Sequence, residues 1–163
     1  MPHLRRFLLV LTVTLGVLIP NLTADNACPV TTPPDPSFVP PAPYRPNAAQ
    51  EAFWYGTPSL WAHLPSDGVW QGLPRRDGGG YFNKLPLWQQ GYNGRSEPEP
   101  DIILVLRRLD ATVPLVSQRG GTNAFADNTW TMLTGVLFPT QGCWEVTAHH
   151  DGHTLTFVLS IQP

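Results

Sequence analysis

The sequence predicts one all-β domain, an antiparallel β-sandwich over residues 52–163. A strong hairpin signal, Asp151-Gly152, lies between two stretches in which apolar and polar residues alternate. Further turn signals rich in Gly, Asp and Pro recur about every ten to twenty residues, with β-branched and aromatic residues between them. No long segment shows the 3.6-residue apolar period of an amphipathic helix. The spacing therefore favours short strands in two packed sheets.

Residues 1–27 have the pattern of an export signal. Basic residues open the segment, and the apolar run from Phe7 to Ile19 is shorter than the about 20 residues of a membrane-spanning helix. Ala24 and Ala27 are the candidate cleavage points. We expect a secreted or extracytoplasmic protein. Membrane attachment remains open through an uncleaved signal or through lipidation of Cys28.

Residues 28–51 are expected to form an extended Pro-rich arm. Eight prolines fall within residues 29–46, which excludes a helix or a central strand and favours polyproline II. Such an arm is a stiff spacer that holds the domain off a membrane or wall, or a peptide ligand for a partner. Phe38, Val39 and Tyr44 could instead hold the arm against the domain.

The hairpin at Asp151-Gly152 specifies its own register. Pairing outward from the turn places His150 opposite His153, and the apolar residues of both strands then share one face. A slip by one residue would turn this whole face to water. An isolated hairpin is only marginally stable, so a second sheet must cover the face. Its apolar members are Trp144, Val146, Ala148, Leu155, Phe157, Leu159 and Ile161.

The other strands are predicted between the remaining turn signals. The clearest is 102–109, which is apolar on both faces at its start and is therefore expected at the centre of a sheet. Residues 95–101, RSEPEPD, should be a solvent-exposed connection into it. Strands with less distinct boundaries are expected at 53–55, 60–64, 69–73, 81–88, 113–117 and 130–137.

Four phrases of the sequence carry a resemblance to a known kind of protein. The segment Phe138–Thr147, FPTQGCWEVT, resembles the last-but-one strand of immunoglobulin-like domains in exported bacterial proteins. WYG at Trp54, LPSDGVW ending at Trp70 and RRLD beginning at Arg107 are similar to uncharacterised secreted proteins of this kind. The resemblance covers about residues 52–161 and implies an immunoglobulin-like sandwich, with no catalytic residue. The Cys…Trp…Cys spacing of antibody domains is absent.

Two cysteines in an exported chain favour a disulfide between Cys28 and Cys143. The hairpin register turns Cys143 away from the apolar face, so its partner has to come from outside the sandwich. An N-terminal arm laid across that outer face would supply Cys28. The alternative is two unpaired thiols, one of them lipidated.

Charge and motif content exclude several classes of function. Cleavage after Ala24, the preferred point, removes Arg5 and Arg6 and leaves 8 basic against 12 acidic residues, a net charge of about −4. Nucleic-acid and anionic-membrane binding need dense Lys and Arg, so neither partner is expected. The chain has no Gly-x-Ser-x-Gly elbow, no Cys with a placed His and no recognisable pair of carboxylates. We therefore expect a protein that is not an enzyme and has no cofactor.

Histidines at the hairpin tip suggest a metal site. His150 and His153 face the same side of the hairpin, where two imidazoles could share zinc or copper. His149 points to the other face, and His63 is the remaining candidate for a third histidine ligand. Metal binding at His150 and His153 is thus one alternative function.

Aromatic residues suggest a second alternative, carbohydrate binding. Planar side chains stack on sugar rings when they are exposed together, whereas most Trp residues in a small sandwich serve as packing. We therefore expect a structural or binding module of the cell envelope, whose partner is an envelope protein or a polysaccharide. The residues concerned are Trp54, Trp61, Trp70, Trp88, Trp130, Tyr55, Tyr81 and Tyr92.

Overall fold

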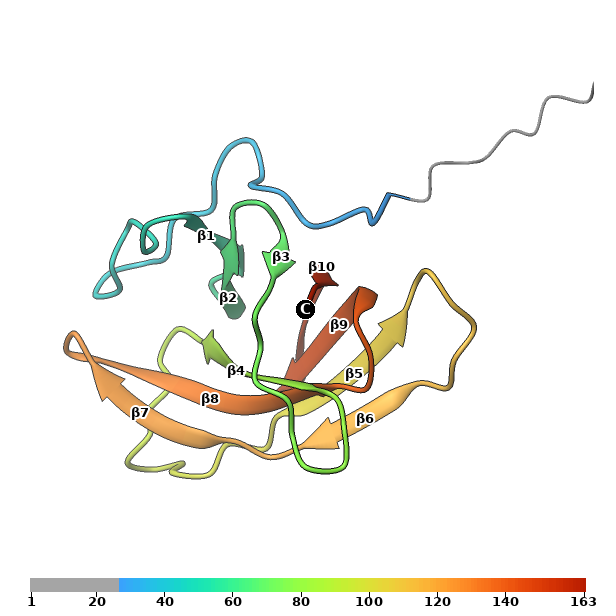
Figure 1. Ribbon diagram of the computed structural model, residues 1–163. Helices are drawn as coiled ribbons and strands as arrows, with labels where there is room; N and C mark the ends of the chain where they lie inside the picture. The colour runs from blue at the N-terminus through green and yellow to red at the C-terminus, as the bar shows by residue number, and fades with distance from the viewer. Residues whose placement is uncertain (1–26) are drawn as a thin grey trace, which may run out of the picture.

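The computed structural model describes residues 27–163, which form ten β-strands and no helix (Figure 1). The all-β prediction is therefore confirmed, whereas the predicted signal lies outside the described residues except for Ala27. Within residues 27–163, no helix has the length and apolar character needed to cross a membrane. The strands are β1 Ala52–Thr57, β2 Leu60–Pro65, β3 Val69–Trp70, β4 Tyr81–Trp88, β5 Ile103–Arg108, β6 Val116–Arg119, β7 Thr122–Ala126, β8 Thr129–Phe138, β9 Gly142–His150 and β10 His153–Ile161.

The ten strands of the described chain make two five-stranded sheets. Sheet A has the order β1-β2-β4-β8-β7, and sheet B has the order β3-β10-β9-β5-β6. Each pair is antiparallel except β3 with β10, which is parallel. In the β9–β10 hairpin, His150 pairs with His153 and Val146 with Phe157. This is the predicted register, and the positive φ angles of Asp151 (47°) and Gly152 (73°) suit a type I′ turn.

The core lies between the inward faces of the two sheets. All seven apolar residues of the predicted hairpin face are at most 5% exposed. Sheet A covers these residues. The hairpin needs this cover, because an isolated hairpin is only marginally stable in water. The contribution of sheet A to the common core is Leu60, Ala62, Leu64, Leu85, Leu87, Met132, Val136 and Phe138.

Strands β6 and β7 depart most from the sequence prediction. The strand expected at 113–117 begins only at Val116, because Pro114 has no N–H to donate to a ladder. Gly120 and Gly121 do not close a hairpin. They carry the chain from the edge of sheet B to the edge of sheet A, so β6 and β7 belong to different sheets. Strand β7 had not been predicted, since TNAFA is short and has little β-branched character.

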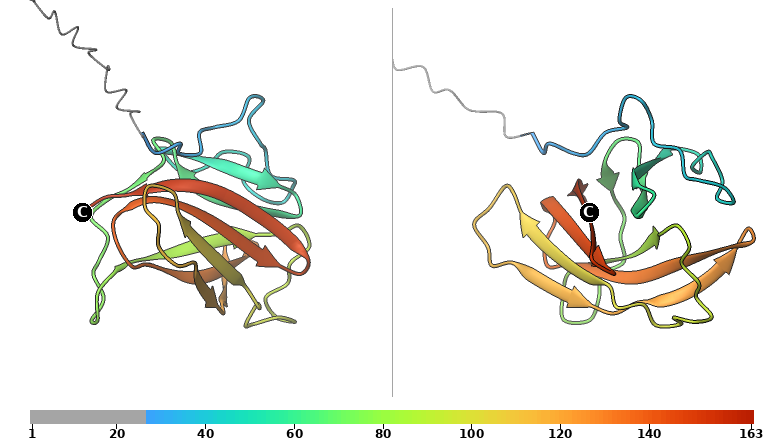
Figure 2. Two further views of the ribbon diagram at one scale, coloured as in Figure 1. Left: turned by 90° about the vertical axis from the view of Figure 1, so that its right-hand side faces the viewer. Right: turned by 180° about the vertical axis from the view of Figure 1, so that it is seen from behind.

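The N-terminal segment is bound to the domain by a disulfide between Cys28 and Cys143, whose Cα atoms are 5.3 Å apart. The predicted bond is thus confirmed. Beyond it, the N–H of Thr31 donates to the carbonyl of Val158 (2.9 Å), and the N–H of Val158 donates to Thr31 Oγ1 (2.8 Å). Val158, an apolar residue on the outer side of β10, therefore lies beside this segment. Figures 1 and 2 show the segment running along one side of the molecule.

A second apolar layer lies between the arm and the outer face of sheet A. Trp61 is fully buried there, outside the main core, with Phe38 and Tyr44 of the arm packed on its ring at centroid distances of 5.9 and 4.9 Å. Val39, in contrast, is 59% exposed. Every Trp and Tyr within residues 27–163 is buried or half-buried.

Candidate functional site

The candidate site lies at one end of the molecule, which we call the distal pole. The connection from β4 to β5, the β7–β8 turn and the β9–β10 turn meet there. The opposite end, the proximal pole, carries the Cys28–Cys143 disulfide and the β5–β6 connection. Strand β9 runs from one pole to the other, and a rise of about 3.3 Å per residue separates Cys143 from His150 by roughly 23 Å. Figures 1 and 2 show the β5–β6 connection and the β7–β8 turn at opposite ends.

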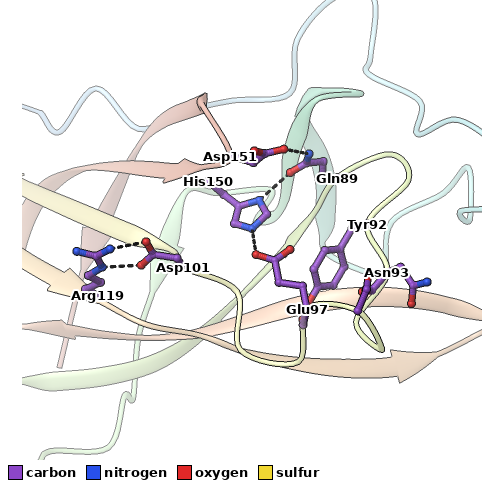
Figure 3. Close-up of polar contacts among 9 residues, drawn as sticks. Gln89, Tyr92, Asn93, Glu97, Asp101, Arg119, His150 and Asp151 are labelled. Atoms are coloured by element: carbon purple, nitrogen blue, oxygen red, sulfur yellow. Dashed lines mark hydrogen bonds and ion pairs between the residues drawn. The ribbon is translucent and has the colours of Figure 1, made fainter.

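His150 is the centre of a polar network at the distal pole (Figure 3). It is only 4% exposed, and its two ring nitrogens face two acceptor oxygens. Nδ1 lies 2.7 Å from Gln89 Oε1, and Nε2 lies 3.2 Å from Glu97 Oε1. Gln89 Nε2 in turn donates to the carboxylate of Asp151 at 3.5 Å. One histidine therefore connects the β4–β5 connection with the β9–β10 turn.

Both ring nitrogens of His150 have a hydrogen-bond partner, Gln89 Oε1 on one side and Glu97 Oε1 on the other. A buried polar side chain needs such partners, because an unpaired polar group in the interior costs free energy. The network thus positions two loops and leaves neither ring nitrogen of His150 free for a substrate.

Tyr92 packs against this network from the β4–β5 connection. Its ring meets that of His150 edge to face at a centroid distance of 6.1 Å, and its hydroxyl donates to the carbonyl of Glu97 at 2.8 Å. Burial, together with the negative charge of Glu97, raises the pKa of Tyr92 to about 12. The side chain therefore acts as a neutral hydrogen-bond donor that holds the loop.

Alkaline pH should destabilise the protein through Tyr92. The unfolded chain releases the phenolic proton near pH 10, whereas the folded chain holds it until about pH 12. The folded state thus binds more protons in this window, so its stability is complete below pH 10 and falls as the pH rises towards 12. Urea unfolding across this window should show a smaller decline for Tyr92→Phe than for the wild type. Equal slopes for the two proteins would contradict this prediction.

The surface of the distal pole carries one exposed aromatic side chain. Phe125 is 58% exposed and lies 4.8 Å, between ring centroids, from the half-buried Trp130. A Cβ on Gly94 would approach Trp130 Cε3 to 2.5 Å, so the loop needs glycine at this point of contact. Asn123 also donates to the carbonyl of Gly94. The loop and the hairpin are therefore packed into one surface.

Arg119 and Asp101 form an exposed ion pair beside the network (Figure 3). Hydrogen bonds from the guanidinium group lower the pKa of the Asp101 carboxyl, with smaller contributions from the charges of Arg119 and His150. Exposed ion pairs contribute little to stability, because solvent and salt screen their charges. The pair therefore orders the start of β5 and the end of β6 rather than holding the fold together.

The structure does not assemble the predicted metal site. His150 and His153 are paired across the hairpin as expected, but the nitrogens of His150 bond to Gln89 and Glu97. The proposed third ligand, His63, lies on β2 against Trp54, at a centroid distance of 5.4 Å. Across residues 27–163, no group of three or more His, Cys, Asp or Glu side chains could hold a metal ion.

The partners of His150 were not predicted from the sequence. Residues 95–101 were expected to be solvent-exposed, yet Glu97 reaches the buried imidazole. A signal for this contact was present, because the hairpin register already places His150 on the same face as Ala148 and Leu155. A titratable side chain on a buried face needs a polar partner. The identity of that partner, however, depends on a loop more than fifty residues away.

Comparison of this chain with protein-family models, with curated proteins and with solved structures found no match.

Proposed function

We propose that this protein is an exported, non-catalytic binding module of the cell envelope, attached at its proximal pole and contacting a partner at its distal pole. One observation carries the proposal. The Cys28–Cys143 disulfide fixes the N-terminal segment at one end of β9, while the His150 network and the exposed Phe125 lie at the other end. Attachment through the N-terminus thus leaves the distal pole directed away from the point of attachment.

The disulfide supports export. Structural disulfides form and persist in oxidising compartments outside the cytoplasm. Cys28 also follows directly on the predicted signal, residues 1–27. Cleavage there yields a secreted protein, and retention of the signal or lipidation of Cys28 yields an envelope protein held to a membrane. In either case the bond holds Cys28 at the proximal pole.

The strand order supports an immunoglobulin-like sandwich. In that fold, strands A, B, E and D form one sheet, and strands G, F and C form the other, with C′ added in variable-type domains. Here β2-β4-β8-β7 follows the first order, and β10-β9-β5-β6 follows the second. Strands β1 and β3 are additions at the edges. In variable domains the B–C and F–G loops bind the ligand. Their counterparts here, β4–β5 and β9–β10, are the loops that His150 joins.

A side-chain corner gives further support for this fold. Immunoglobulin-like domains have a tyrosine near the start of strand F whose hydroxyl bonds to the backbone a few residues upstream. Trp144 occupies a comparable place in β9, and its Nε1 donates to the carbonyl of Thr140 at 3.0 Å. The sequence resemblance of Phe138–Thr147 covers the same corner.

The polar groups at the distal pole favour a binding role over catalysis, because they hold the loops together. His150, Gln89, Glu97 and Tyr92 bond to one another or to backbone, and so hold the loops in place. Preformed loops lose little entropy on binding, which favours affinity. The exposed Phe125 next to Trp130 provides an apolar contact of the kind found at the centre of binding interfaces.

The test compares two exposed apolar residues at opposite poles. Mature protein is isolated from the envelope of the source organism, where its mass should show the loss of about 24 to 27 N-terminal residues. It is then sedimented with purified envelope material. Phe125→Ser (58% exposed, distal) should abolish co-sedimentation, whereas Leu115→Ser (62% exposed, next to the proximal β5–β6 connection) should retain it. Equal binding by both variants, or a protein that retains Met1 in the cytoplasm, would contradict the proposal.

A further inference from the structure

A groove of about 400 Å³ lies on the outer side of sheet A, apart from the His150 network. Strand β4 contributes Phe82 and Lys84, strand β8 contributes Gly135, and the crossing from β6 to β7 contributes residues 119–122. The crossing leaves sheet B for sheet A at this point, so β7 runs beside only the first half of β8. The groove lies beside the second half of β8, where β7 no longer pairs with it.

The pairing of β4 with β8 determines where the backbone of Gly135 points. Pro86 lies opposite Leu133, and since proline has no N–H this is a pair without ladder hydrogen bonds. Such pairs alternate with hydrogen-bonded ones in antiparallel sheets. Lys84 and Gly135, two residues further along each strand, therefore also form a pair without ladder hydrogen bonds. The N–H and C=O of Gly135 point away from β4 and into the groove.

The neighbouring residue Leu137 confirms this direction. Its N–H donates to Gln118 Oε1 at 2.9 Å, and its carbonyl accepts from Gln118 Nε2 at 2.8 Å, both on the side away from β4. Thr122 pairs with Leu133, at the end of the pairing between β7 and β8. If that pairing continued by two more residues, Gly120 would lie opposite Gly135. Gly120 instead donates its N–H to the carbonyl of Ile102 at 2.9 Å. The N–H of Gly135 is thus offered to the groove, together with its carbonyl, which also lies 3.5 Å from Thr134 Oγ1.

The side chains of the groove are cationic although the mature protein is acidic. Lys84, the single lysine of the chain, and Arg119 line it, and the charge of Arg119 is already paired with Asp101. The guanidinium group of Arg76 lies over the Phe82 ring, 3.9 Å from the centroid, which holds a third positive charge next to the lining. Lys84 and Arg76 therefore give this side of the sheet a local positive charge, near the backbone donor of Gly135.

We propose that this groove binds a carboxylate-bearing sugar of an acidic polysaccharide. Lys84 neutralises the carboxylate, the N–H of Gly135 donates to it, and the C=O of Gly135 accepts from a neighbouring sugar hydroxyl. Charge-assisted hydrogen bonds of this kind are about twice as strong as neutral ones. The inference rests on the proposed function, since it gives an envelope module a polysaccharide ligand at a second surface.

The experiment titrates the mature, disulfide-bonded protein with oligogalacturonate in a calorimeter at low salt. Lys84→Gln removes one charge-assisted bond and should weaken binding about tenfold or more. Gly135→Ala places a methyl group 2.9 Å from Phe82 Cε2, at the edge of the groove, and should weaken binding to a similar degree. Arg95→Gln removes the same charge at the exposed Arg95 of the β4–β5 connection and should change the affinity less than about twofold.

Two further ligands determine which chemistry is recognised. A neutral dextran of the same length should not bind, and poly(glycerol phosphate) should bind more weakly than oligogalacturonate. Full affinity in Lys84→Gln, equal binding of dextran, or a preference for the phosphate polymer would each overturn the assignment. Thermal melting checks that Gly135→Ala remains folded, and Lys84 is an exposed side chain that can be changed without loss of packing. If groove binding fails while Phe125→Ser still abolishes envelope binding, the distal-pole proposal stands alone.

Discussion

Replacing Trp144 or Phe157 with alanine should lower the free energy of unfolding by roughly 3–5 kcal/mol in each case. Both side chains are 1% exposed and face sheet A from neighbouring strands of sheet B. Truncation removes the transfer energy of a large aromatic group and leaves a cavity that the surrounding strands refill only in part. Trp144 also loses the hydrogen bond from Nε1 to the carbonyl of Thr140. Urea or guanidinium unfolding of the oxidised protein measures these changes.

Thr156→Ala is the matched control on the opposite face of β10. Its hydroxyl lies 3.1 Å from Thr147 Oγ1 on the exposed side of the hairpin, where a substitution costs about 0.5 kcal/mol or less. A loss as large as that of the aromatic truncations would contradict the register of the β9–β10 hairpin. The test depends on packing alone, so it needs only the free energy of unfolding of each variant.

Removal of the Cys28–Cys143 disulfide should give the second large effect. The bond closes a loop with a sequence separation of 115 residues, and the chain-entropy account assigns such a loop on the order of 4–5 kcal/mol of stabilisation. The double substitution of Cys28 and Cys143 by serine should therefore lower the midpoint of chemical unfolding sharply. Non-reducing digestion of the wild type should keep the peptides that contain the two cysteines joined.

The same variant tests whether the disulfide holds the arm on the domain. Without the bond, hydrogen exchange should accelerate at the N–H of Thr31 and of Val158, which bond across the contact between arm and β10. Val39→Ser, at a 59% exposed position of the arm, is the control and should change neither stability nor exchange. Unchanged stability after removal of both cysteines would show that noncovalent contacts suffice to hold the arm.

Local information was sufficient for the β9–β10 hairpin. A type I′ turn accepts Asp-Gly, and the alternation of apolar residues permits one register, so turn and strands lead to the same pairing. The strand at 81–88 was also predicted with its observed boundaries. For the candidate site, the sequence placed His150 on the apolar face of the hairpin. Its contacts with Gln89 and Glu97 could not be predicted, because they depend on how a distant loop crosses the end of the sheets.

The all-β class and the hairpin register could be predicted from the sequence because each depends on neighbouring residues. The sequence favoured the disulfide between the two cysteines but left two unpaired thiols as an alternative, which the structure excludes. The packing of distant segments alone shows that Gly120 and Gly121 cross between sheets, that Trp61 is buried beneath the arm, and that Gly135 faces an open groove. The physical reason is the same in each case. Glycine turns and aromatic side chains are compatible with several local structures, and the packing of chain segments far apart in sequence selects one of them.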